Sequence, residues 1–143
     1  MAQINTDPGE RDLGHLRLLA VFHFVMAALG ALGLLFLIGH YALMNMVMEA
    51  APPTASNGPS PAEVLAMLRW VYWVLGAVGL LFAAGNLLSG LYLRRQVNRG
   101  FSLVMAGINC LQMPLGTILG VFTLIVLLRD SVRRRYLDAA RPA

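Results

Sequence analysis

Long apolar runs separated by short polar segments dominate this chain. The run from Leu18 to Ile38 contains no charged residue, and 24 uncharged residues lie between Arg69 and Arg94. About 20 helical residues cross the hydrocarbon of a bilayer. Each run therefore predicts a transmembrane helix, the first over about 15–48 and the second over about 61–95.

The segment between these runs has the composition of a loop. Residues 49–62 contain four prolines together with Ser, Asn and Gly, which favour turns over helix. Ser60, Pro61 and Glu63 then form a helix-start pattern, with Ser60 as N-cap, Pro61 at the first helical position and Glu63 completing a capping box. The second helix is therefore predicted to begin at Pro61.

A third apolar run, residues 101–128, is interrupted by Pro114 and Gly116, so it either crosses the membrane once or folds back as a hairpin. Pro removes a backbone donor and Gly permits left-handed dihedrals, and both favour a turn there. The hairpin places ten arginines on one side of the membrane and only Arg69 on the other, as the positive-inside rule expects. A single crossing would instead divide the arginines five against six.

Two observations favour the single crossing. Hairpin arms over about 100–113 and 115–129 are each roughly 20 Å long, which is short for a full crossing. A straight helix would also align six small or polar residues near one face, namely Ser102, Asn109, Gln112, Gly116, Gly120 and Thr123. The arginine distribution weighs more, so the hairpin is our prediction, either across a thinned bilayer or as a re-entrant loop.

The predicted fold class is therefore an all-α integral membrane protein with two long transmembrane helices and a short C-terminal hairpin, four helices in all. Residues 15–128 form a single membrane-embedded domain. Residues 1–14 are expected to be a flexible cytoplasmic tail and residues 129–143 a basic cytoplasmic tail that meets anionic headgroups. Both termini then face the cytoplasm.

Composition supports a lipid environment. The 143 residues are 58% hydrophobic and only 13% charged, with a mean hydropathy of +0.68. A soluble domain of this length could not bury so much apolar surface, and one cysteine, Cys110, cannot build a disulfide scaffold. The eleven basic residues are all arginines at the ends of apolar runs, a pattern typical of membrane orientation and not of nucleic-acid binding.

Small residues recur at steps of three and four along both long helices, a pattern that permits close helix packing in lipid. The first stripe contains His23, Met26, Gly30, Gly33, Leu37 and His40, and the second Tyr72, Gly76, Gly79, Ala83, Asn86 and Gly90. Such faces pack either within the chain or between copies.

The apolar segments contain no Asp, Glu or Arg, which argues against a proton-coupled transporter and leaves no base–nucleophile set for catalysis. We expect no enzyme activity and no cofactor. The candidate pore or packing residues are His23, Asn86, Asn109, Gln112, Gly116, Thr117 and Gly120. We interpret His23 as a neutral imidazole bonded to a neighbouring carbonyl, to Asn86 or to Asn109; the alternative is a pH-sensitive gate.

His40, Met44 and Met48 fall on one helix face, with Met46 nearby. Imidazole and thioether ligands suit Cu(I), so these four residues are the candidate metal ligands. Met also fills gaps as a flexible apolar side chain, and we prefer that interpretation.

Two stretches, residues 15–23 and 110–123, resemble a set of small bacterial multi-helix inner-membrane proteins. Those proteins share the HLxLLxxFH start and the C-x-x-x-P-x-G-T-x-L-G-x-x-T core found here. The resemblance implies an integral inner-membrane protein and implies no activity, ligand or catalytic residue.

The hypothesis that follows is a non-enzymatic membrane protein, a self-associating helical scaffold or an accessory subunit of a membrane complex. It would associate with a second copy or a membrane partner and not with nucleic acid. The rival is a small homo-oligomeric channel or transporter whose hairpin lines a pore. A third possibility is copper binding at the Met cluster.

Overall fold

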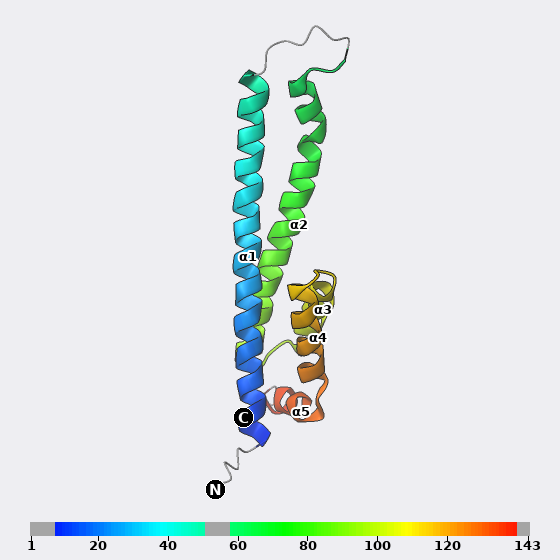
Figure 1. Ribbon diagram of the computed structural model, residues 1–143. Coiled ribbons are helices and arrows are strands. Elements are labelled where there is room, and N and C mark those ends of the chain that lie inside the picture. The colour runs from blue at the N-terminus through cyan, green and yellow to red at the C-terminus, as the bar shows by residue number, and fades with distance from the viewer. Residues whose placement is uncertain (1–7, 51–57, 140–143) are drawn as a thin grey trace. The chain divides into compact units, whose positions relative to one another are not determined.

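The computed structural model describes residues 8–50 and 58–139, and every regular element in that part of the chain is a helix. The helices are α1 (Pro8–Ala50), α2 (Pro61–Arg95), α3 (Arg99–Cys110), α4 (Leu115–Leu128) and α5 (Asp130–Ala139) (Figure 1). The all-helical prediction is confirmed. Helices α1 and α2 are both long and apolar enough to cross a membrane.

The start of α2 follows from local chemistry. The Ser60 amide donates to the Glu63 carboxylate at 2.7 Å, and the Glu63 amide donates to the Ser60 hydroxyl at 3.3 Å. This reciprocal pair is the predicted capping box, with Pro61 as the first helical residue. The prediction that α2 begins at Pro61 is confirmed.

The N-terminal tail prediction was wrong for residues 8–14, because α1 begins at Pro8 and not near residue 15. Proline suits a first helical position, where its missing amide costs nothing and its fixed φ is already helical. Asp12 is buried, and its carboxylate lies 3.8 Å from the Arg129 guanidinium. This ion pair joins the first turns of α1 to the end of α4. Residues 1–7 lie outside the described part of the chain.

The predicted count of four helices was wrong, because Asp130–Ala139 in the basic C-terminal segment forms a fifth helix, α5. The chain bends by 68° between α4 and α5. Val132 and Tyr136, one turn apart, are both buried, whereas Arg133 and Arg134 are exposed. An apolar pair at this spacing makes a short amphipathic helix even in an arginine-rich segment. Arg141 lies outside the described residues.

The chain reverses between α3 and α4, as the hairpin prediction expected. At one end, Nε of Arg99, the first residue of α3, donates to the Leu127 carbonyl at 2.8 Å. At the other end, a Cβ added at Gly116 would lie 2.5 Å from the Asn109 carbonyl oxygen. The two helices are therefore antiparallel and in close contact along their lengths.

Two glycines of α4 make this close approach possible. A Cβ added at Gly120 would lie 2.5 Å from Sγ and 2.8 Å from the amide nitrogen of Cys110, and would also meet the Ala106 carbonyl oxygen. Gly116 is opposite Asn109 in the same way. Since the obstacles include backbone atoms, no side-chain movement could make room for a larger residue. Gly116 and Gly120, two of the candidate pore or packing residues, therefore lie in a helix-packing contact.

The described residues group into two compact units. Unit 1 contains the chain up to Ala27 and from Ala84 onward, and unit 2 is Ala28–Ala83. Helices α1 and α2 each contribute to both units. Unit 1 therefore contains parts of five helices, and unit 2 contains parts of two.

Candidate functional site

Six polar side chains with 0% exposed surface lie inside unit 1. They come from four different helices: His23 in α1, Asn86 and Ser89 in α2, Ser102 and Asn109 in α3, and Thr123 in α4. We call this group the polar cluster. Buried polar groups are costly unless they find hydrogen-bond partners, so the bonds within the polar cluster decide what it does.

Asn86 is at the centre of the polar cluster. Its side-chain oxygen lies 2.9 Å from Nδ1 of His23 and accepts a hydrogen bond from Nδ2 of Asn109, also at 2.9 Å. Since the Asn86 oxygen can only accept, Nδ1 of His23 carries the proton in this arrangement. One amide oxygen thus joins α1, α2 and α3. The prediction that His23 bonds to Asn86, one of three expected partners, is confirmed.

Thr123 connects the fourth helix to the same group. Its hydroxyl donates to the Leu119 carbonyl of its own helix at 2.8 Å and lies 3.4 Å from Nε2 of His23. The imidazole of His23 is thereby placed between the Asn86 amide and the Thr123 hydroxyl. Each ring nitrogen of His23 therefore faces a polar atom on a different helix.

Three oxygens of the polar cluster have no hydrogen-bond partner among the described residues: Oγ of Ser89, Oγ of Ser102 and Oδ1 of Asn109. Asn109 contacts Asn86, and further along the same helices Phe101 and Tyr92 make an edge-to-face ring contact with centroids 5.4 Å apart. Ser89 on α2 and Ser102 on α3 both lie between these two contacts along the α2–α3 pair. Sequence reasoning missed Ser89, although its position one turn after Asn86 was the available signal.

The other candidate pore residues are not gathered with the polar cluster. The Thr117 hydroxyl donates to the Cys110 carbonyl at 2.9 Å, across the hairpin turn. Gln112 is exposed in that turn. Asn109 lies in the polar cluster, where it is bonded to Asn86. These three candidates thus have different surroundings: Asn109 is buried, Thr117 bonds across the turn and Gln112 is exposed.

The candidate metal residues are in unit 2, where His40 has a different partner. Its Nδ1 lies 3.0 Å from the Tyr72 hydroxyl, and the two rings stack with centroids 6.0 Å apart. Met44 and Met48 are half-buried and Met46 is exposed. In the described segments, no group of three His, Cys, Asp or Glu side chains is placed to hold a metal ion.

The predicted stripes of α1 and α2 pack against each other inside the chain. In unit 2, a Cβ added at Gly30 would lie 3.1 Å from Cβ of Ala83, and one at Gly79 would lie 2.9 Å from a methyl of Leu34. His40 and Tyr72 continue the same contact. Gly33 is the exception, because a Cβ there would have no atom within 4 Å. The stripes therefore form a helix-pair contact within this chain, with Gly33 left open.

Comparison of the chain with protein-family models, with curated proteins and with solved structures finds no match.

Proposed function

We propose that the protein is a non-enzymatic, multi-pass protein of the bacterial inner membrane in which α1 and α2 cross the bilayer. A helix of 35 residues, the length of α2, spans about 52 Å, which exceeds the ~30 Å of hydrocarbon. The reversal between α3 and α4 supports an orientation with ten arginines on the cytoplasmic side and Arg69 alone on the other. Both termini are then cytoplasmic.

The hairpin is proposed to be re-entrant, entering from the cytoplasmic side and returning to it. Helices α3 and α4 have 12 and 14 residues, or about 18 and 21 Å, which falls short of a full crossing. Leu111 and Met113 at the turn are 84% and 86% exposed, which suits a tip surrounded by acyl chains. Internal bonds also occupy polar groups of the turn, including Thr117 to Cys110, as lipid requires.

Within this frame we propose that the protein acts as a helical scaffold or accessory subunit that associates with a second copy or with a larger membrane complex. One observation carries the proposal: the polar side chains of unit 1 bond to one another across helices of a single chain. Polar residues used in this way hold helices together. Gly33 in unit 2 is the small residue of the stripe that remains open to a neighbouring helix.

Association through Gly33 can be tested by comparing two leucine substitutions in one stripe. Gly33→Leu has room within the chain, so we expect the free energy of unfolding to stay unchanged while self-association weakens by about fivefold. Gly30→Leu would meet Ala83 and should destabilise the α1–α2 contact itself. Light scattering in detergent and cross-linking in vesicles measure the copy number.

The contradicting outcomes differ for each part of the proposal. A strictly monomeric protein that co-purifies with no partner would rule out the scaffold. Ion conductance in liposomes containing the purified protein would replace the scaffold proposal with the channel.

The topology can be tested with single cysteines in a Cys110→Ala background. Cysteines at Gly100 and Ser131 should label from the cytoplasmic side, and a cysteine at Ser60 should label from the opposite side. Labelling of Gly100 and Ser131 from opposite sides would refute the re-entrant hairpin.

A further inference from the structure

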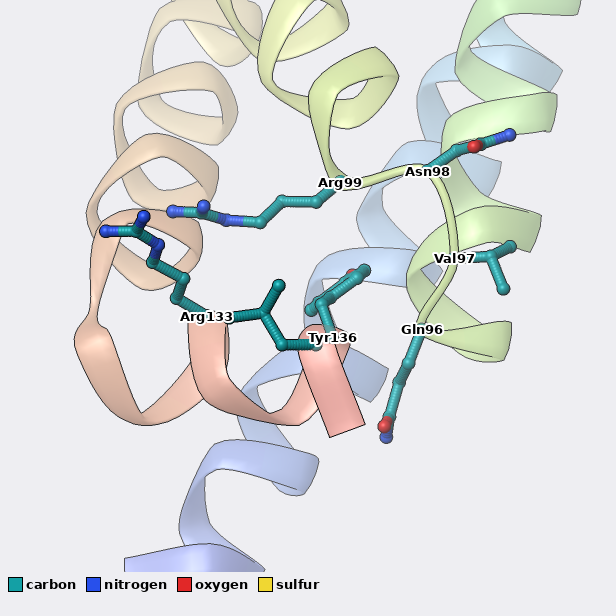
Figure 2. A pocket seen from close by; sticks show the side chains of 7 residues that line it. Gln96, Val97, Asn98, Arg99, Arg133 and Tyr136 are labelled. Atoms are coloured by element: carbon teal, nitrogen blue, oxygen red, sulfur yellow. The ribbon is translucent and has the colours of Figure 1, made fainter. Parts of the chain in front are cut away.

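The α2–α3 connection and α5, both in unit 1, enclose a pocket of about 470 Å³. Figure 2 labels six of the residues that line it: Gln96, Val97 and Asn98 on the connection, Arg99 at the start of α3, and Arg133 and Tyr136 on α5. The side chains of Arg99 and Arg133 extend toward the same side of the pocket in this view. The pocket is separate from the polar cluster and contains none of its residues.

The positive charges in this pocket are not neutralised by the protein. Nε and Nη2 of Arg99 both donate to the Leu127 carbonyl, an acceptor with no net charge. Among the described side chains the ion pair within 4 Å is that of Asp12 with Arg129, which leaves Arg99 and Arg133 without a carboxylate partner. Arg99 is half-buried, and a half-buried guanidinium without a counter-ion is unfavourable. An anion in the pocket would therefore stabilise Arg99, and the exposed Arg133 guanidinium could donate to the same anion.

Uncharged donors are available at the same place. Helix α3 begins at Arg99 and has no side-chain cap on its first turn, since its N-cap residue Asn98 adopts φ 48° and ψ 50°. Tyr136 is 8% exposed, and its hydroxyl is buried with no hydrogen-bond partner among the described residues. Figure 2 shows the Tyr136 side chain extending from α5 toward the connection that carries Val97 and Asn98. Helix N-termini, guanidinium groups and phenols all donate to phosphate oxygens.

We propose that this pocket binds the phosphate group of an anionic membrane phospholipid, held by Arg99 and Arg133 with the Tyr136 hydroxyl and the α3 N-terminus as further donors. The proposal rests on the proposed membrane location. Leu137 also lines the pocket and is 60% exposed. An apolar side chain beside a phosphate site suits the acyl chains of a lipid and offers nothing to a free phosphate ion.

The test uses the full-length protein purified in a neutral detergent, with native mass spectrometry to count bound lipids. We expect phosphatidylglycerol to be retained over phosphatidylcholine. Arg133→Gln should reduce that retention about fivefold. Arg134→Gln is the matched control: it removes one charge from the next residue of α5, which is also exposed but does not line the pocket, and it should change retention less than twofold.

Two further measurements make the proposal falsifiable. Tyr136→Phe keeps the buried ring and should lower phosphatidylglycerol retention without changing the helix content. Equal losses for Arg133→Gln and Arg134→Gln would overturn the site in favour of diffuse attraction to the membrane surface. Full displacement of the lipid by inorganic phosphate would assign the site to a soluble anion. If the protein is instead extracted from membranes by alkaline carbonate, the proposed membrane location fails, whatever the result for the lipid.

Discussion

Units 1 and 2 use the same two long helices in different ways. In unit 1, α3 and α4 pack beside them, and the polar cluster between the four helices has no exposed surface. In unit 2, the described residues belong almost entirely to α1 and α2, which meet through Gly30, Gly79 and the half-buried His40–Tyr72 pair. The difference lies in how many helices surround the contact.

The number of helices around a polar side chain determines how much its hydrogen bonds contribute to stability. Between two helices, one side of each contacting residue remains open, so a polar group there can find partners outside the pair. Among four helices, the same group depends on its neighbours, because an unmade hydrogen bond costs about 1–3 kcal/mol once buried. We therefore expect polar substitutions to be severe in unit 1 and mild in unit 2.

The sharpest test of this difference is the removal of Asn86. In Asn86→Ala, His23 and Asn109 both lose the oxygen that they share, and two buried donors are left unmet. We expect the free energy of unfolding to fall by about 3 kcal/mol, measured by equilibrium unfolding in mixed micelles. Asn45→Ala is the control in unit 2, since Asn45 donates to the Tyr41 carbonyl of its own helix. Equal losses for the two variants would contradict the comparison.

Two glycine substitutions, one in each unit, test helix packing rather than hydrogen bonding. Gly120→Ala places a methyl group against the backbone of α3, so we expect a loss of about 2 kcal/mol in the free energy of unfolding. Gly33→Ala in unit 2 meets no atom within 4 Å, and we expect no loss. The same unfolding assay compares both variants. A tolerated Gly120→Ala would show that the hairpin arms are not in the close contact described.

The His40–Tyr72 pair allows one interhelical hydrogen bond of unit 2 to be measured. Tyr72→Phe removes the hydroxyl 3.0 Å from Nδ1 of His40 but keeps the ring stacking. An interhelical bond of this kind contributes about 0.6 kcal/mol in membrane proteins, and we expect a loss of that size. The control is Tyr92→Phe, at a ring that contacts Phe101. A loss as large as that of Asn86→Ala would mean that enclosure does not govern these bonds.

The smallest expected effect concerns pH at the edge of unit 1. Burial raises the pKa of Tyr136 to about 12, with the nearby Arg99 charge acting in the opposite direction. The folded chain thus favours the protonated phenol. Its contribution to stability is complete below pH 10, the ordinary pKa of tyrosine, and is lost as the pH rises through 12. The difference in ultraviolet absorbance between the wild type and Tyr136→Phe should titrate near pH 12; titration near pH 10 would show that the ring is not buried.

Sequence reasoning predicted those features that depend on nearby residues. Pro61 and Glu63 predicted the start of α2, the Pro114–Gly116 interruption predicted the hairpin, and the stripes of α1 and α2 predicted which faces would pack. It failed for α5, because the high charge of the segment concealed the Val132–Tyr136 spacing. Ser89 was missed although it lies one turn after Asn86, because that spacing does not show which part of α2 is covered by α3.

The sequence by itself determined that the chain is helical and where the chain reverses between α3 and α4. These features depend on apolar runs, caps and turn residues, which are local in the sequence. Only the tertiary structure decided that His23, Asn86, Asn109 and Thr123 meet, and that Arg99 and Arg133 line one pocket. These contacts depend on how the helices are aligned along their axes and on which helices surround each residue. The spacing of residues along a single helix gives neither piece of information.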